Sequence, residues 1–456
     1  MADPSAPGPV RALWATAWPL IVAYSLQAVI GFTDTWFAGR ISAHALAGLG
    51  AQTFLNLAVF VLLGGVAFAV QMPVANAVGA GQPRAAWSWL SAALAAAGLT
   101  LPCFAALAWA GPELFTLWQL PAASAEQAVL YWQPRMAGGA AVVALFAVTS
   151  YLSGMGRTLG SLWANLAAAV ANVPLNQWLI FDQGLGLAGA AHASTLASLV
   201  GLAVGLAAAA HGGAGPLPRL SALWAQVLAL CRLGVPIGVA ASADVLAFAV
   251  FQLLMSHIGP VEGAATLLLL SLTGLAFWPA LGLATGCTSL IGHAAGAGDW
   301  RRVQPLVHAT LWLMAGWMLL VGAAMALAGP QLLAALLGDA GPEAQPVLAL
   351  ATSLLWIVAA YQVFDAINLG SAFTLRGLGD VRWASAINTL CSFALFLPLA
   401  AWLSLDSLAP GIPALGWGAR GGWAAAALLS VVLAVAFHAR LRWVLRRQLP
   451  ERRAMP

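Results

Sequence analysis

Long apolar blocks alternate with short polar stretches along the whole chain of 456 residues. None of these blocks shows the strict alternation of apolar and polar positions that the strands of a membrane barrel require. A block of about 20 apolar residues is long enough to cross a bilayer as a helix. The pattern predicts twelve transmembrane helices, over residues 14–38, 45–76, 87–110, 126–152, 160–181, 186–210, 226–256, 263–294, 303–329, 345–373, 382–404 and 418–445.

The composition supports a membrane protein. Hydrophobic residues make up 62% of the chain and charged residues only 7%, whereas a soluble domain carries about 25% charged residues. So few charges cannot cover a surface that faces water. Inside lipid every backbone polar group must be bonded internally, which helices achieve. We therefore predict an all-α membrane protein.

Prolines, glycines and polar residues recur at fixed offsets, so the chain repeats. Six helices in each half give both halves the same orientation, as in many secondary transporters. We predict two pseudo-symmetric six-helix lobes at residues 1–210 and 226–456, joined by a cytoplasmic linker at 211–225, with the six extra residues of the second half near 337–348. The matched pairs are Pro19 and Pro236, Ile41 and Ile258, Gly79 and Gly296, Gly81 and Gly298, and Arg84 and Arg301, each 217 residues apart, and Gly154 and Gly377, Gly156 and Gly379, and Asn165 and Asn388, each 223 apart.

All 18 basic residues are arginine, and their distribution predicts the orientation. With a cytoplasmic N-terminus, 15 arginines fall on the cytoplasmic side, and only Arg40, Arg135 and Arg420 fall outside. Basic residues concentrate on the cytoplasmic side of membrane proteins. We expect a multi-pass monomer in the inner (plasma) membrane, with both termini cytoplasmic. The basic C-terminal tail then lies near anionic lipid, and we expect no nucleic-acid partner.

Three acids lie well inside apolar segments: Asp34 in the first, Asp244 in the seventh and Asp365 in the tenth. A charged side chain inside a membrane is costly, so it usually faces a cavity or a partner. Such an acid can also serve only to fix helix packing. Three of them in one chain favour a function.

The fifth segment adds amides, in the stretch "NLAAAVANVPLNQWLIF". Asn165, Asn172 and Asn176 follow one another by seven and four residues, so they share one helix face. Pro174 lacks a backbone N–H and frees a carbonyl in the preceding turn. Amide oxygens, a free carbonyl and a carboxylate would suit Na⁺ or a proton. The alternative is an amide network that only joins helices.

The repeat separates these polar residues into two sites. The acids and amides of one half align with apolar or neutral residues in the other, whereas purely architectural acids would recur at matched positions. We infer an ion-handling cluster in the first half and a separate acidic site in the second. The aligned pairs are Asp34 and Phe251, Asn172 and Leu395, Asn176 and Leu399, Asp244 and Gln27, and Asp365 and Val142.

The sequence has no convincing enzymatic motif. The stretch "GLGD" at residues 377–380 matches a pattern of intramembrane aspartyl proteases. However, Asp380 lies between Arg376 and Arg382 in a predicted turn, away from a shared desolvated site with Asp365. No Walker motif is present. The four cysteines stand far apart without ligand spacing and are interpreted as small core residues. We predict that the protein is not an enzyme.

Several of these stretches together resemble the MATE (multidrug and toxic compound extrusion) transporters, in particular the NorM-type branch. The resemblance covers nearly the whole chain. It implies two six-helix lobes in a V shape, alternating access and cation-coupled export of bulky organic cations. The stretches are "WPLIVAYSLQAVIGFTDTWFAGRISAHALAGLG", "NVPLNQWLIF", "GLGLAGAAHAST", "LGVPIGVAASADVLAF" and "YQVFDAINLGSAFTLRGLGDV".

The resemblance also implies roles for individual residues. Asp34, Asn172 and Asn176 match the family's N-lobe cation site, and Ser194 stands where a hydroxyl residue often joins it. Asp244 and Asp365 match C-lobe acids implicated in cation or drug binding, and Pro19 matches a proline at a bend of the first helix. All of these residues lie within the stretches quoted above.

Two departures from the family pattern leave the coupling ion open. The seventh-helix acid is often Glu, whereas this chain has Asp244, and Asn176 stands where some members have a second Asp. Na⁺ bound by Asp34, Asn172 and Asn176 and a proton on Asp34 are both compatible with the sequence. No other metal and no cofactor are expected.

We therefore predict an antiporter that exports organic, mostly cationic, drugs against inward Na⁺ or H⁺ flow. The alternative is an exporter or flippase of another cargo, such as a metabolite or a lipid-linked sugar, on the same fold. A pyrophosphate cargo would need several basic groups in the cavity. The charges expected inside the membrane are acidic, which favours a cationic cargo.

Overall fold

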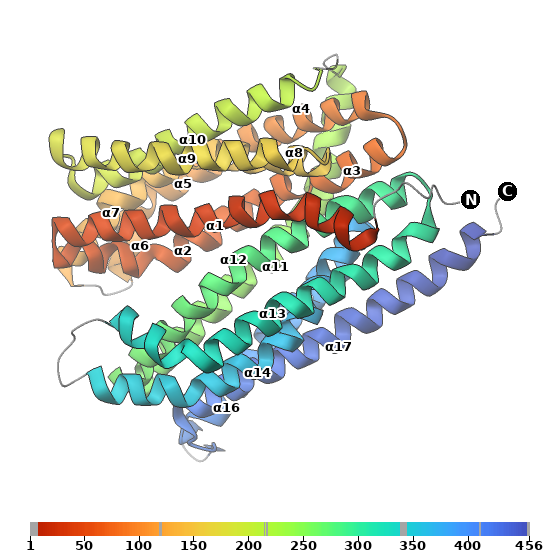
Figure 1. Ribbon diagram of the computed structural model, residues 1–456. Helices are drawn as coiled ribbons and strands as arrows, with labels where there is room; N and C mark the ends of the chain where they lie inside the picture. The colour runs from red at the N-terminus through yellow and green to blue at the C-terminus, as the bar shows by residue number, and fades with distance from the viewer. Residues whose placement is uncertain are drawn as a thin grey trace. The chain divides into compact units, whose positions relative to one another are not determined.

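The computed structural model describes residues 8–117, 121–213, 215, 218–337, 344–409 and 412–453. Almost all of these residues are helical (Figure 1). The exception is a pair of short antiparallel strands, β1 (Ser407–Ala409) and β2 (Ile412–Pro413), in which Ser407 pairs with Pro413 and Ala409 with Ile412. The fold is therefore all-α, as the sequence predicted.

The helices follow the predicted apolar blocks, and two of them contain a π-helical stretch. In chain order they are α1 (Pro9–Ile41), α2 (Ala43–Phe68), α3 (Gln71–Gly79), α4 (Pro83–Leu99), α5 (Leu101–Trp109), α6 (Gly111–Leu117), α7 (Ala122–Ala137), α8 (Gly139–Gly154), α9 (Thr158–Gln177), the π-helix η1 (Trp178–Asp182), α10 (Gly186–Ala210), α11 (Leu220–Ile258), α12 (Pro260–Gly296), α13 (Trp300–Leu337), α14 (Ala344–Gly377), α15 (Val381–Leu390), the π-helix η2 (Cys391–Phe396), α16 (Leu397–Ser404) and α17 (Gly418–Arg453).

Each predicted membrane segment corresponds to one helical run within the described residues. By length and composition, ten runs could cross a membrane, and α7 with α8 makes an eleventh if this pair, bent by 52°, is one span. The twelfth run is α9 with η1. It is not among the ten or eleven because three asparagines, Gln177 and Pro174 interrupt its apolar residues. The polar residues predicted to form a site on this helix therefore also weaken its apolar signal.

The bend between α7 and α8 falls at two successive glycines, four residues after Pro134 on α7. A Cβ atom on Gly138 would overlap the side chain of Thr195 on α10, and one on Gly139 would overlap the ring of Phe104 on α5. The neighbouring helices therefore approach the chain more closely here than any other residue would allow. Helix kinks usually occur at glycine or proline positions of this kind.

The predicted repeat is visible in the turns that end matching helices. Gly81 and Gly298, 217 residues apart, have φ angles of 72° and 69°. Gly156 and Gly379, 223 residues apart, have φ angles of 73° and 86°. Side chains other than glycine rarely adopt this left-handed conformation. The same type of turn thus follows the corresponding helix in each half of the chain.

The chain forms two compact units. One consists of Ala15–Ser242 with Gly292–Asp299, and the other of Met1–Trp14, Ala243–Ile291 and Trp300–Pro456. Within the first unit α9 lies beside α10, and within the second α13 lies beside α14 (Figure 1). The lobe limits at residues 210 and 226 stay a prediction. Residues 214, 216 and 217 of the predicted linker and 338–343 of the predicted insertion lie outside the described residues.

The two units have different interiors. In the first, Phe37, Leu49, Tyr131, Ile180 and Leu187 belong to one buried cluster from four helices and η1. In the second, the rings of Phe251, Phe396 and Trp423 pack together, with centroids 5.4 Å and 5.6 Å from that of Phe251. Because Phe251 is the repeat counterpart of Asp34, the position that carries an acid in one half is part of an aromatic core in the other.

Candidate functional site

Asp34 on α1 is the centre of a buried polar cluster. Only 5% of this residue is exposed. Its Oδ2 atom accepts hydrogen bonds from the Ser194 hydroxyl at 2.6 Å and the Tyr131 hydroxyl at 3.2 Å. Its Oδ1 atom accepts from the Nδ2 atoms of Asn176 at 3.0 Å and Asn172 at 3.4 Å. Four neutral donors from three other helices therefore surround one carboxylate.

The two amides of this cluster are also linked to each other. The Nδ2 atom of Asn176 donates to Oδ1 of Asn172 at 3.0 Å, and Nδ2 of Asn172 donates to the Ser194 hydroxyl at 3.2 Å. Both asparagines are fully buried. The Oδ1 atom of Asn176 is buried without a hydrogen-bond partner among the described residues. An unpartnered carbonyl oxygen beside a carboxylate is the type of ligand that Na⁺ and other hard cations prefer.

Local helix geometry aims these side chains at Asp34. Asn172 and Asn176 are four residues apart on α9, so they project from one face. The π-helical segment η1 begins at Trp178, directly after α9 ends at Gln177. Short π-helical segments inside α-helices occur frequently at functional sites. The second lobe shows a related arrangement, because η2 begins at Cys391 and includes Ser392.

Two residues of this site were missed in the sequence: Tyr131 and Arg135 on α7. The sequence places Arg135 among the arginines of the outer side, which stays a prediction. It lies within α7, and its guanidinium carbon is 4.7 Å from the ring centroid of Phe60. Its Nε and Nη1 atoms are buried and have no hydrogen-bond partner in the described part of the chain. Its charge acts electrostatically on Asp34 without an ion pair between them. The sequence feature that could have indicated these two residues is a Tyr and an Arg four positions apart inside an apolar block.

Asp244 is the centre of the second lobe's polar group. This half-buried acid on α11 accepts hydrogen bonds from Nδ2 of Asn388 at 2.6 Å and from the hydroxyl of Ser392 at 2.8 Å. Asp365 on α14 is also half-buried and accepts from Nδ2 of Asn368 at 3.2 Å. The two carboxylates are close enough to repel each other. Asp244 and Asp365 thus belong to one acidic region of this unit.

The same interhelical contact occurs in the first lobe with a neutral residue in place of the acid. Asn165 is the repeat counterpart of Asn388. Its Oδ1 atom accepts a hydrogen bond from Nε2 of Gln27 at 2.8 Å. Gln27 is the repeat counterpart of Asp244. The structure therefore keeps the contact between the matched helices, whereas the carboxylate is present in one half only.

Pro19, the expected bend position, lies within a single continuous helix, α1. The residue is buried. Because proline has no N–H, the carbonyl of Ala15 lacks its usual helical donor. A bend at Pro19 therefore stays a prediction about another conformation.

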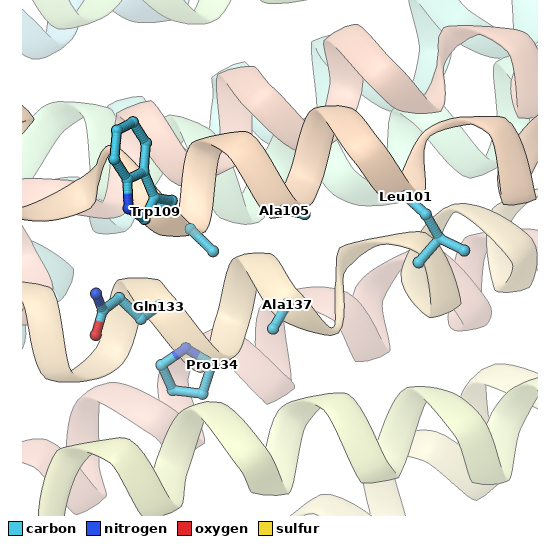
Figure 2. A pocket seen from close by; sticks show the side chains of 7 residues that line it. Leu101, Ala105, Trp109, Gln133, Pro134 and Ala137 are labelled. Atoms are coloured by element: carbon cyan, nitrogen blue, oxygen red, sulfur yellow. The ribbon is translucent and has the colours of Figure 1, made fainter.

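A separate cavity of about 530 Å³ lies between α5 and α7, as Figure 2 shows, and none of the predicted site residues lines it. Trp109 and Gln133 are at one end and Leu101 at the other. Most of its lining is apolar and exposed on the helix surfaces. The remaining lining residues are Ala105, Ala108, Pro134 and Ala137.

Membrane-length helices in two repeated halves, with carboxylates held inside them by polar side chains, define a polytopic membrane transporter. The MatE family model matches the chain twice, at residues 19–178 and 236–402. The two matches begin at Pro19 and Pro236, which are the first pair of the predicted repeat. Together they cover more than half of the chain, so the protein belongs to the MATE family of transporters and is not an enzyme.

Relatives support the same family. A probable multidrug resistance protein NorM of Rhizobium meliloti is 30% identical over 92% of this chain and 90% of its own. The multidrug resistance protein MdtK of Edwardsiella ictaluri is 26% identical over 96% of both. An outward-facing multidrug resistance MATE transporter of the MOP superfamily matches with a TM-score of 0.84 at 17% identity, over 97% of both chains. The solved structure supports the fold, and the relatives support the predicted NorM-like branch.

Proposed function

We propose that the protein exports organic, mostly cationic, drugs from the cell in exchange for Na⁺ or H⁺. The observation that carries this proposal is the surroundings of Asp34. Its four hydrogen-bond donors are all neutral, and no basic group of the described residues lies within ion-pair distance. A buried carboxylate whose bonded partners carry no charge is stabilised when a small cation or a proton joins it.

Asn172, Asn176 and Ser194 serve as neighbours of the bound cation in this proposal. Oδ1 of Asn176 has no hydrogen-bond partner within the described part of the chain, so it is available to a Na⁺ ion. A proton on Asp34 would instead turn one acceptor oxygen into a donor. Either event neutralises the carboxylate, reorganises the hydrogen bonds that join α1 to α9 and α10, and favours bending of α1 near Pro19. The drug then leaves the outward-facing cavity.

Asp244 and Asp365 are the proposed negative charges for a cationic drug or a second cation. Among the residues that the structure describes, Asp365 has one hydrogen-bond donor, Asn368, whereas Asp244 has two. Asp365 is therefore the freer of the two to bind a ligand. The names of the relatives, multidrug resistance proteins, support drugs as the cargo.

Export of a lipid-linked sugar is the competing function. A pyrophosphate group would need several basic residues in the transport path. One arginine, Arg135, acts on the buried acid of the first lobe, Asp34, and one, Arg376, acts on Asp244 in the second. The acids of both lobes favour a cation.

The test uses the purified chain in liposomes with a fluorescent cationic dye and separately imposed Na⁺ and pH gradients. We expect one gradient to move the dye, which identifies the coupling ion. Asp34→Asn is expected to lower this movement to the level of protein-free liposomes while the protein still inserts. Glu113→Gln removes an exposed acid of the same unit and is the matched control, with wild-type rates expected. Wild-type rates in Asp34→Asn would contradict the role of Asp34.

A further inference from the structure

The far end of α17 carries a second, unrelated site. A cavity of about 420 Å³ lies between one face of α17 and the turn at residues 378–380 that precedes α15. None of the buried acids discussed above lines it. The lining residues are Leu378, Gly379, Asp380, Arg440, Trp443, Val444 and Arg447.

Two arginines in this cavity stack on one indole. The guanidinium carbons of Arg440 and Arg447 both lie 4.2 Å from the ring centroid of Trp443. Arg440 also lies 5.1 Å from the ring of Trp383 on α15. Arg440, Trp443 and Arg447 follow one another on α17 by three and four positions, so they share one helix face. Stacking fixes the plane of a guanidinium and leaves the N–H groups at its edge free to bind an oxyanion.

The charges of the cavity do not cancel. Nε of Arg440 forms an ion pair with Oδ2 of Asp380 at 2.6 Å, and their side chains are only 20% and 16% exposed. Asp380, the acidic residue that lines the cavity, is therefore neutralised by Arg440. Arg447 has no ion-pair partner among the residues whose side chains the structure describes. One stacked guanidinium therefore remains to attract an anion.

The start of α15 adds to this attraction. Asp380 occupies the N-cap position, but its side chain makes no capping hydrogen bond because it pairs with Arg440. The first backbone N–H groups of α15 therefore donate no hydrogen bond to this N-cap side chain. Such groups carry a partial positive charge that favours anions.

We propose that this cavity binds the phosphate headgroup of an anionic phospholipid. The cavity lies at the end of a helix whose preceding residues are apolar enough to cross a membrane, and headgroups lie at that depth. Tryptophan is enriched at the same level of membranes. The planar edge of the Arg447 guanidinium can donate to two oxygens of one phosphate. This site is independent of the transport proposal.

Native mass spectrometry of the full-length purified protein tests the proposal, with phosphatidylglycerol and phosphatidylcholine added at equal concentration. We expect retention of phosphatidylglycerol in preference to phosphatidylcholine. Arg447→Gln is expected to weaken phosphatidylglycerol binding by roughly tenfold, the effect of losing a charged hydrogen bond. Arg447→Lys, which keeps the charge but not the planar stack, should lose less.

Arg446→Gln is the matched control. It removes the same charge from the adjacent, exposed position that does not line the cavity, so a change below about twofold is expected. Equal losses in Arg446→Gln and Arg447→Gln would overturn the site in favour of general surface charge. Displacement of the lipid by millimolar inorganic phosphate would overturn the lipid assignment in favour of a soluble phosphate. Thermal unfolding of each variant verifies that the fold is intact.

Discussion

Asp34 and Arg135 carry opposite charges in the first lobe and differ in how well they are hydrogen-bonded. The carboxylate is satisfied by four neutral donors. The guanidinium has two buried nitrogen atoms without a partner among the described residues. Burial of such a group costs free energy that a nearby opposite charge partly offsets. The arginine thus contributes a fixed positive charge to the surroundings of the acid, and that charge must oppose the arrival of a cation.

Replacing Arg135 should therefore tighten cation binding. We expect Arg135→Met to lower the half-saturating concentration of the coupling cation on the order of tenfold, which corresponds to an interaction of about 1.4 kcal/mol. Arg135→Lys keeps the charge and should leave this value near that of the wild type. The readout is dye transport in liposomes at graded Na⁺ concentration or pH.

Thermal unfolding distinguishes this role from a structural one. Because Met has a similar length and needs no hydrogen bonds, Arg135→Met should unfold at the wild-type temperature or higher. A lower unfolding temperature with unchanged cation affinity would show that Arg135 only supports packing through Phe60.

At the scale of helices, close packing in the first unit depends on a pair of glycines in α11. A Cβ atom on Gly238 would overlap the backbone of Leu62 on α2, and one on Gly234 would overlap Val66. The two glycines are four residues apart on the helix, a spacing that lets membrane helices approach closely. The contact therefore has no room for a methyl group.

Gly238→Ala should lower the free energy of unfolding by about 2 kcal/mol, because a packed helix contact must open to admit the new atom. Thermal unfolding in detergent measures the change. Gly98→Ala on α4 is the control, because its Cβ meets nothing within 4 Å. It should be neutral or slightly stabilising, since alanine favours helices more than glycine does. Equal effects of the two substitutions would contradict the tight α2–α11 contact.

The helices were predictable because the backbone N–H and C=O groups of an apolar block in lipid must bond to one another. The proximity of Asn172 and Asn176 was also predictable, because residues four positions apart lie on one face of a helix. Ser194 was assigned only through the family resemblance. Tyr131 and Arg135 lie four residues apart in an apolar block, but this spacing does not identify Asp34 as their neighbour. The segments η1 and η2 were also unpredictable, since a π-helical turn has no distinctive sequence.

At the scale of the whole molecule, the two halves share turns and contacts but not charges. The glycines with positive φ recur, and the contact of Gln27 with Asn165 recurs as that of Asp244 with Asn388. The repeat could be read from the sequence because turn glycines and helix-contact amides are constrained by backbone geometry. The acids are not constrained in this way, so each half is free to carry a different site. Under the proposed function, one shared scaffold therefore carries a cation site in the first half and an acidic binding region in the second.

The orientation of the molecule is the remaining large-scale prediction, and residues 83–109 offer a direct test. This run is one of the spans, and exposed Gln82 and Glu113 flank it. In a variant without the four native cysteines, Glu113→Cys should react with a membrane-impermeant maleimide on right-side-out spheroplasts. Gln82→Cys should react only after lysis, because the arginine distribution places its turn in the cytoplasm. The reverse pattern would invert the predicted topology, and labelling of both sites before lysis would contradict the span between them.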